Sequence, residues 1–229
     1  MHIFLTGANR GIGLEFARQF IARGDRVIAS VREPAAATAL QELAANASGA
    51  LEIIALDTTS PEGWCAVAGM LMERSLDLLV NNAGIYRREG PLGEFQYEAF
   101  RESFEVNTLA PLRGLEACLP ALRRGSQRKV VTLTSKMGSI IENTSGGAYA
   151  YRSSKTALNS AMRSAALDLK SEGFTVAVFH PGWVQTEMGG PNALIDVQTS
   201  VASMLKGIDG LQPSETGSFL EWSGGHIGW

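Results

Sequence analysis

Tyr151 and Lys155 stand four residues apart in a stretch whose apolar spacing, through about residue 171, predicts a helix. Residues four apart on a helix share one face, roughly 5–6 Å apart at Cβ, so this spacing places an ammonium group beside a phenol. A neighbouring positive charge favours the phenolate and lowers the pKa of the phenol from about 10. Such a tyrosine can exchange a proton with a carbonyl or alcohol oxygen near neutral pH. Chance also produces this spacing in many helices, so the surrounding sequence must decide its meaning.

The elements that must position this pair follow a regular order along the 229 residues. Short β-rich runs alternate with helical stretches, which predicts a single α/β domain with a doubly wound parallel sheet and helices on both faces. Seven strands are expected, at 2–5, 26–30, 51–56, 76–80, 129–134, 175–180 and 218–222. Helices are expected at 13–23, 35–46, 61–74, 97–122 with an interruption at Pro111, 150–171 and 199–207.

Composition excludes several classes of protein. Apolar residues make up 45% of the chain, enough for a substantial core, and no linker or repeat divides it. The net charge of −3 offers no basic field, so neither nucleic-acid nor membrane binding is expected. Cys65 and Cys118 lie in apolar helical stretches, which indicates buried thiols in a reducing compartment. No metal-ligand cluster is expected and no signal peptide is recognisable, so we expect a cytoplasmic protein without a metal.

The first strand leads into a glycine-rich turn, Thr6–Gly13, and then into a helix. Its spacing is Gly-x3-Gly-x-Gly, and no Gly-Lys-Ser/Thr follows, so it is not a phosphate loop of the Walker type. Glycines permit a tight turn and the close approach of a pyrophosphate, and the helix start offers free N–H groups. A glycine turn without a ligand remains the alternative. The candidate cofactor-binding residues of this turn are Gly7, Asn9, Arg10, Gly11, Ile12 and Gly13.

Arg32 follows the second strand, where an acidic residue would favour NAD. An arginine there accommodates the 2′-phosphate of NADP(H), and Arg10 in the glycine turn can supply a second cation, so NADP(H) is expected over NAD(H). Arg32 as a solvated surface residue is the alternative, since Glu33 adjoins it. Asp57 and Thr58 after the third strand are candidates for the adenine side, and Asp57 can equally cap the helix that follows.

With these pieces together, the chain resembles the short-chain dehydrogenase/reductase family. Within that family it is most similar to the C-factor and sniffer-type carbonyl reductase branch, through the runs 7–13, 135–139, 181–186 and 188–190. The motifs occur in the family's order over nearly the whole chain; they are Thr6-Gly7-x3-Gly11-x-Gly13, Asn81-Asn82-Ala83-Gly84, Asn107, Ser135, Tyr151-x3-Lys155 and Pro181-Gly182.

The resemblance implies a Rossmann fold and hydride transfer between a nicotinamide and a carbonyl carbon. By that likeness Tyr151 is the acid in reduction, while Lys155 lowers its pKa and holds the nicotinamide ribose. Ser135 donates to the substrate oxygen, and Asn107 anchors a proton-relay water. Ser135 as a strand-end hydroxyl that completes a turn, and Asn107 as a helix-terminus residue, remain the alternatives.

The resemblance also assigns further cofactor contacts. The turn 81–84 would line the adenosine side through Asn81, Ala83 and Gly84, whereas Asn82 suits a structural role. The Val184 backbone and the Thr186 hydroxyl would fix the nicotinamide carboxamide. Pro181 and Gly182 are further candidate cofactor-binding residues, at the start of a short substrate loop over 182–198.

Ser135 lies further from Tyr151 than in many members of the family, and the extra length over 141–148 indicates a loop insertion. A short substrate loop suggests an open pocket for small aldehydes or ketones. The family also implies a homodimer or homotetramer, and the apolar tail 222–229 either adds an interface or packs on its own sheet. A dinucleotide-binding signalling protein with little turnover is the alternative function. The candidate pocket walls are Met137, Ile141, Tyr149, Trp183 and Met188.

Overall fold

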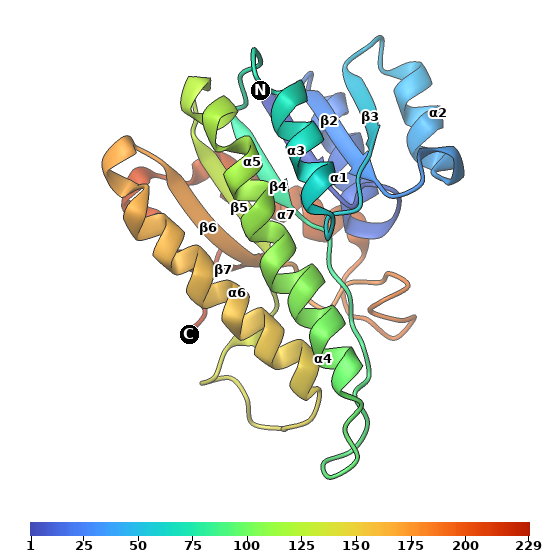
Figure 1. The fold of residues 1–229 in the computed structure, drawn as a ribbon, viewed down its shortest axis with the longest axis vertical. Coiled ribbons are helices and arrows are strands. Elements are labelled where there is room, and N and C mark those ends of the chain that lie inside the picture. The colour runs from blue at the N-terminus through green and yellow to red at the C-terminus, as the bar shows by residue number, and fades with distance from the viewer.

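The computed structural model describes residues 1–229, which form one seven-stranded parallel sheet in the order β3-β2-β1-β4-β5-β6-β7 (Figure 1). The strand order reverses between β1 and β4, which creates a topological switch point where such sheets bind ligands. The predicted Rossmann-type α/β fold is therefore confirmed. The strands are β1 (His2–Thr6), β2 (Arg26–Val31), β3 (Leu51–Ala55), β4 (Leu78–Asn81), β5 (Lys129–Leu133), β6 (Thr175–His180) and β7 (Ser218–Glu221).

Helices cover both faces of the sheet, and each face has its own apolar core (Figure 1). On one face lie α1 (Gly11–Ala22), α2 (Thr38–Asn46) and α7 (Val197–Gly210), which bury side chains such as Phe16 and Met204. On the other lie α3 (Pro61–Met70), α5 (Ala110–Arg124) and α6 (Tyr149–Asp168), which bury side chains such as Trp64 and Leu158. Short 3₁₀ helices η1 (Pro34–Ala36), η3 (Lys136–Gly138), η4 (Lys170–Glu172) and η5 (Pro213–Glu215) join these elements.

The strands in the middle of the sheet are buried on both faces, which explains their composition. In β5 and β6 nearly every residue is buried, and both strands are rich in the β-branched residues Val and Thr. Leu5 of β1 pairs with Ala29 of β2 on one side and Val80 of β4 on the other. This register brings the carboxyl ends of the central strands to the same edge.

The helix predicted over 97–122 is built differently from the expectation. It comprises α4 (Tyr97–Phe104), a π-helical segment η2 (Glu105–Leu109) and α5. Pro111 does not interrupt it, because it lies in the first turn of α5, where its missing N–H costs little. The irregularity is the π segment before it, a feature that often marks functional sites.

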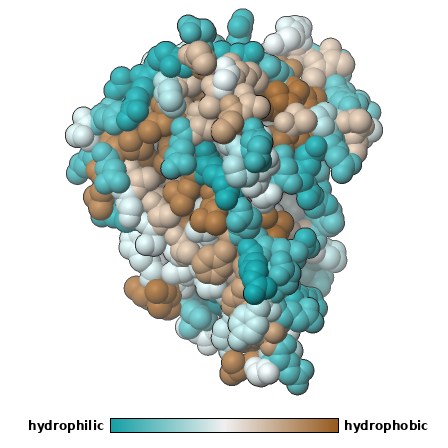
Figure 2. Space-filling view, viewed as in Figure 1, coloured by the Kyte–Doolittle hydropathy of each residue, from teal (hydrophilic) through white to brown (hydrophobic).

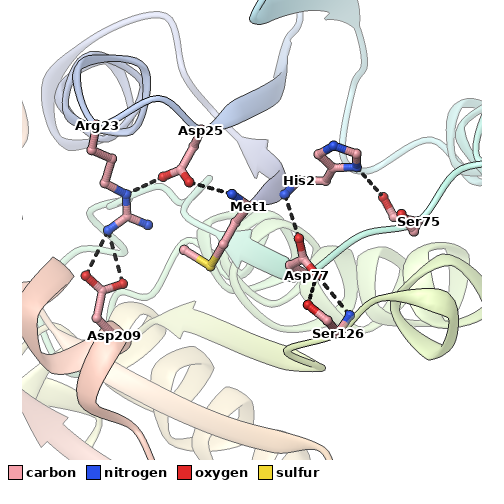
Figure 3. A network of polar contacts seen from close by, with 8 residues as sticks. All are labelled: Met1, His2, Arg23, Asp25, Ser75, Asp77, Ser126 and Asp209. Carbon is pink, nitrogen blue, oxygen red and sulfur yellow. Dashed lines mark hydrogen bonds and ion pairs between the residues drawn. The ribbon is translucent and has the colours of Figure 1, made fainter.

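The amino-terminal edge of the sheet is fixed by a polar network (Figure 3). The backbone N–H of His2 donates to Asp77 at 2.8 Å, and Ser126 donates to the same carboxylate through its N–H and hydroxyl, both at 2.9 Å. The Met1 amino group pairs with Asp25 at 2.7 Å. These contacts lie at the amino-terminal ends of the strands, opposite the glycine turn, so they can stabilise the sheet without occupying the edge where a ligand would bind.

The C-terminal tail packs on its own sheet. The N–H of Ile227 donates to the carbonyl of Phe219 in β7 at 2.9 Å, and the Trp229 ring lies 5.4 Å from the Phe219 ring between centroids. No helix has both the length and the apolar composition that crossing a membrane requires.

Candidate active site

The glycine turn between β1 and α1 is shaped by backbone that only glycine accommodates well. Gly7 and Gly11 have φ values of 69° and 53°, in the left-handed region. A Cβ atom at Gly13 would stand 2.1 Å from the carbonyl oxygen of Gly7, so the start of α1 packs directly on the turn. The result is an uncovered backbone surface at the N-terminus of a helix, which suits an anionic group. Asn9 and Ile12 belong to the same turn and helix start.

The turn after β4 braces the glycine turn. The Asn82 amide donates to the carbonyls of Thr6 and Gly7 at 2.8 and 2.9 Å, a structural role. Asn81 is buried, and its amide donates to the Pro111 carbonyl at 3.3 Å, so its side chain points into the protein and away from the ligand edge. Of the residues expected on the adenosine side, this turn therefore presents Ala83 and Gly84 rather than the Asn81 side chain.

Gly84 lies beside two of the candidate catalytic residues. A Cβ atom at this position would stand 3.2 Å from Asn107 Oδ1 and 3.5 Å from Lys155 Nζ. Lys155 is buried, and its amine donates to the Leu133 carbonyl at the end of β5, at 2.9 Å. The same amine lies 6.0 Å from the centre of the Tyr151 ring. The fold therefore gathers residues from β4, β5, η2 and α6 at one edge.

Ser135 follows β5 and begins the short helix η3. Its hydroxyl oxygen accepts the Met137 N–H at 3.1 Å, so the alternative role of completing a turn is present. That role uses the oxygen as an acceptor and leaves the hydroxyl proton free to donate. The Ser135 side chain also acts to lower the pKa of Tyr151, so the two hydroxyl groups belong to one site.

Burial governs the acid–base properties of the pair on α6. It raises the pKa of Tyr151 to about 12, against the effect of Ser135. It lowers the pKa of Lys155 to about 8. The direction for Tyr151 is the reverse of the one expected from the sequence, because removal of the phenol from water is the largest effect and exceeds the lowering by Ser135.

Asn107 lies inside the π segment η2 rather than at a helix terminus. Its side chain is fully buried and holds the backbone of Ile85, accepting from its N–H at 2.8 Å and donating to its carbonyl at 3.0 Å. A third bond reaches the Ser154 hydroxyl at 3.0 Å. Asn107 thus ties α6 to the segment after β4.

The residues expected to contact the cofactor phosphate and adenine, Arg10, Arg32 and Asp57, have different partners in the structure. Arg10 forms an ion pair with Glu187, which joins the glycine turn to the loop 182–198. Arg32 is exposed after β2 and acts to lower the pKa of Asp57. The largest cause of that lowering is the N–H of Thr59, which donates to Asp57 at 2.9 Å.

The helix that follows, α3, is capped by Ser60, whose hydroxyl accepts the Gly63 N–H at 3.0 Å. Asp57 therefore does not cap it. The Thr58 carbonyl accepts the indole N–H of Trp64 at 2.8 Å, so Thr58 supports the turn between β3 and α3.

The loop 182–198 is ordered by its own hydrogen bonds. Val184 is buried and forms an isolated bridge with Ile195, and the N–H of Gln185 donates to Ile195 at 2.9 Å. The Thr186 methyl carbon lies 3.3 Å from where a Gly11 Cβ would stand, so the loop reaches the glycine turn.

At its start, Gly182 has φ of 88°, and a Cβ there would stand 2.3 Å from Ile195. The Pro181 carbonyl accepts the Ser200 hydroxyl at 2.6 Å and ties the loop to α7.

The five candidate pocket walls fall into different settings. The Tyr149 ring packs on Phe95 with centroids 4.9 Å apart. Ile141 is exposed and adjoins Gly228 of the C-terminal tail. Figure 2 shows apolar side chains among polar ones at the lower end of the molecule, where the loops after β4 and β5 lie. The other three lie near the ends of β5 and β6: Met137 is partly buried, and Trp183 and Met188 are exposed.

Two residues near the site carry no motif in the sequence. Tyr86 packs on Tyr151, with ring centroids 5.1 Å apart. Glu89 is buried, and its carboxylate accepts the Tyr149 N–H at the start of α6, at 2.6 Å. Both belong to the irregular segment 85–96, where neither hydrophobic period nor turn chemistry signals a contact with a helix more than fifty residues further along the chain.

Comparison with known proteins agrees with this geometry. A family model described as short chain dehydrogenase matches residues 1–194. The chain belongs to the short-chain dehydrogenase family. It is 49% identical over 154 residues to "C-signal" of Myxococcus xanthus, an alignment that covers 67% of this chain and 93% of that protein. It is 35% identical to "1-hydroxy-2-glutathionyl-2-methyl-3-butene dehydrogenase" of Rhodococcus sp., over 99% of both chains.

Among solved structures, this short-chain dehydrogenase is similar to the carbonyl reductase Sniffer of D. melanogaster. The TM-score is 0.93 and the identity 31%, over 100% of this chain and 99% of the other. It is also similar to an NADPH-bound carbonyl reductase from chicken fatty liver, with a TM-score of 0.92 and 34% identity over 100% and 98% of the two chains. The chain is thus an α/β oxidoreductase of this family by fold and sequence.

Proposed function

We propose that this protein is an NADPH-dependent carbonyl reductase that acts on small aldehydes or ketones. The observation that carries the proposal is the meeting of Ser135, Tyr151 and Lys155 at the carboxyl edge of the sheet, beside the glycine turn. A proton donor, an oxygen-binding hydroxyl and a buried amine are the groups that reduction of a carbonyl requires from the protein. Similarity to solved carbonyl reductases supports the same reaction class.

The residues at this edge fit a nicotinamide dinucleotide. The glycine turn offers backbone that a Cβ atom would block at Gly13, and Lys155 has donors beyond its single bond to Leu133. Gly7, Gly11 and Gly13 would hold the pyrophosphate, and Lys155 the ribose hydroxyls. Val184 and Thr186 would hold the carboxamide. Arg32 is exposed and bears no ion pair, so it is available for a 2′-phosphate, and NADP(H) is preferred over NAD(H) in this proposal. When bound, the cofactor supplies the hydride.

The side chains of this chain handle the proton and the substrate oxygen. Ser135 donates a hydrogen bond to the carbonyl oxygen and orients it. Tyr151, whose phenol is protonated at neutral pH, donates its proton to the developing alkoxide. Lys155 stabilises the phenolate that forms, and Asn107 fixes the segment that holds Gly84 and Ile85 against this group.

Three further parts of the proposal rest on family likeness alone. The loop 182–198 serves as a short substrate loop within the single domain 1–229. The protein works in the cytoplasm. It assembles as a homodimer or homotetramer, with the small-molecule substrate as its partner.

A dinucleotide-binding signalling role is the second candidate. The observation that favours it is the 49% identity to the protein named C-signal. Tight NADPH binding without turnover on any carbonyl compound would favour this second role.

The test is a panel of aldehydes and ketones, run separately with NADPH and NADH. We expect NADPH oxidation with some of them and slower oxidation of NADH. Tyr151→Phe should retain NADPH binding, measured by fluorescence titration, and lose activity by at least about 100-fold, because only the proton donor is removed. Tyr97→Phe, at an exposed tyrosine on α4, is the matched control and should keep full activity. Normal turnover by the Tyr151 variant would refute the assigned mechanism.

A further inference from the structure

An exposed aromatic ring adjoins the proposed proton donor. The rings of Tyr86 and Tyr151 have centroids 5.1 Å apart and planes inclined by 56°. Tyr151 is 9% exposed, whereas Tyr86 is 41% exposed. One part of the Tyr86 ring therefore covers Tyr151, and the rest remains open beside it.

The backbone that carries Tyr86 is held in place rather than loosely looped. Ile85, the preceding residue, exchanges two hydrogen bonds with the buried side chain of Asn107, at 2.8 and 3.0 Å. Three residues further on, the buried carboxylate of Glu89 binds the first N–H of α6 at 2.6 Å. Tyr86 lies between these two anchors, and both join elements of the site itself. A side chain on an anchored backbone loses less entropy when a ligand binds than one on a mobile loop.

Tyr86 also influences the ionisation of Tyr151. Tyr86 contributes to the raised pKa of Tyr151, after burial, and its ring packs on the Tyr151 ring. A carbonyl oxygen that accepts the proton of Tyr151 must lie within hydrogen-bond reach of Tyr151, and its two substituents must extend past the neighbouring side chains. Tyr86 is such a neighbour, and part of its aromatic side chain is open to solvent.

We propose that Tyr86 is a specificity-determining residue that favours substrates with an aromatic ring next to the carbonyl carbon, such as aryl aldehydes and aryl ketones. This inference rests on the proposed carbonyl reductase function. Aromatic rings pair favourably at centroid separations of roughly 4.5–7 Å, beyond what their buried area contributes. An aliphatic ring of equal size gains the apolar contact and lacks this additional interaction.

The experiment compares benzaldehyde with cyclohexanecarbaldehyde, which differ in the aromaticity of the ring. For each enzyme we take the ratio of the two kcat/KM values with NADPH, so that the intrinsic reactivity of the aldehydes cancels between variants. Tyr86→Leu should lower the ratio by about 2- to 10-fold, and Tyr86→Phe should retain it, because the ring is what binds. Tyr97→Leu, at a tyrosine exposed on α4, should leave the ratio unchanged.

The outcomes separate the two proposals. If Tyr86→Leu leaves the ratio unchanged, including the case in which kcat/KM falls equally for both aldehydes, the role of Tyr86 is overturned while carbonyl reduction stands. A wild-type protein that reduces no carbonyl compound overturns both. Because the Tyr86 side chain is half exposed, the variants should fold, and circular dichroism checks this. If Tyr86→Leu does not fold, Tyr86→Met provides a second non-aromatic side chain for the same comparison.

Discussion

At the scale of single residues, the site combines two buried groups whose pKa values move in opposite directions. Burial keeps Tyr151 protonated at neutral pH, with a pKa of about 12, and brings the pKa of Lys155 down to about 8. A protonated phenol suits a proton donor, and a buried amine beside it stabilises the phenolate once the proton has left. The same burial means that the charged lysine lowers the free energy of unfolding, and this effect can be measured.

Lys155→Met should therefore raise stability while it abolishes activity. Lys155 is protonated below pH 8 in both the folded and the unfolded chain, so the folded state carries the full cost of burying the charge. Methionine removes that cost and gives up one hydrogen bond to Leu133, worth about 1 kcal/mol. We expect a net gain of ~1 kcal/mol, or about 2–4 °C in the thermal midpoint near pH 7.

The matched control is Lys206→Met, an equal substitution on the exposed surface of α7, which should change the midpoint little. Carbonyl reduction and NADPH affinity should fall in the Lys155 variant alone. A midpoint that falls in Lys155→Met would show that the amine stabilises the fold, contrary to this argument.

At the scale of elements, the helix that carries Tyr151 and Lys155 begins without a cap of its own. Ala148, before α6, has a left-handed φ of 47° and offers no side-chain cap. Glu89, from the segment after β4, supplies the acceptor instead, and its carboxylate lies at the positive end of the helix dipole. Because Tyr151 is in the first turn of α6, the position of this turn sets the position of the proton donor.

Glu89→Ala should reduce kcat by roughly 10-fold, because small displacements of a reacting group are costly. It should also lower stability by about 1 kcal/mol, as loss of a helix cap does. Glu89→Gln keeps an oxygen acceptor for the Tyr149 N–H and should restore most of both. Glu94→Ala, at an exposed position of the same segment, is the control. The positioning role fails if the alanine and glutamine variants lose activity equally, or if only KM changes.

The elements show which parts of this protein the sequence predicts and which it does not. The parallel sheet follows from apolar runs, and motif spacing predicts Ser135, Tyr151 and Lys155 at one edge, which is where they lie. Tyr86 and Glu89 were not predicted, because they act through contacts with α6 that no local pattern encodes. The rise in the pKa of Tyr151 was missed for the same reason: burial depends on the whole fold, whereas the spacing to Lys155 is local.

At the scale of the whole molecule, the contacts that stabilise the fold and the candidate active site lie at opposite ends of the strands. Its amino-terminal edge is tied by Asp77 and its partners, and its carboxyl edge gathers the candidate site. Burial would raise the pKa of Asp77, but hydrogen bonds from His2 and Ser126 lower it below its usual value of 3.8. A lowered carboxyl pKa stabilises the fold above that value, and the contribution is lost as the pH falls through the lower, folded-state pKa. This network therefore resists mild acid.

His180, at the end of β6, should make the protein lose stability at a higher pH than that network does. Burial lowers the pKa of His180 from 6.5 to about 4, with a smaller effect from Lys136, and its Nδ1 has no hydrogen-bond partner within the protein. Between pH 6.5 and 4 the unfolded chain binds a proton here that the folded chain does not. Stability must then fall as the pH falls through this window, by on the order of 2 kcal/mol at its lower end.

Urea unfolding of the wild type, His180→Gln and His226→Gln, measured at several pH values across this window, tests the assignment. His226→Gln replaces an exposed histidine of the C-terminal tail and should follow the wild type, while His180→Gln should lose clearly less stability on acidification. Below the window all three should weaken together, because Asp77 is common to them. If His180→Gln loses as much stability as the wild type between pH 6.5 and 4, another group takes up the proton and the acid response does not originate at the end of β6.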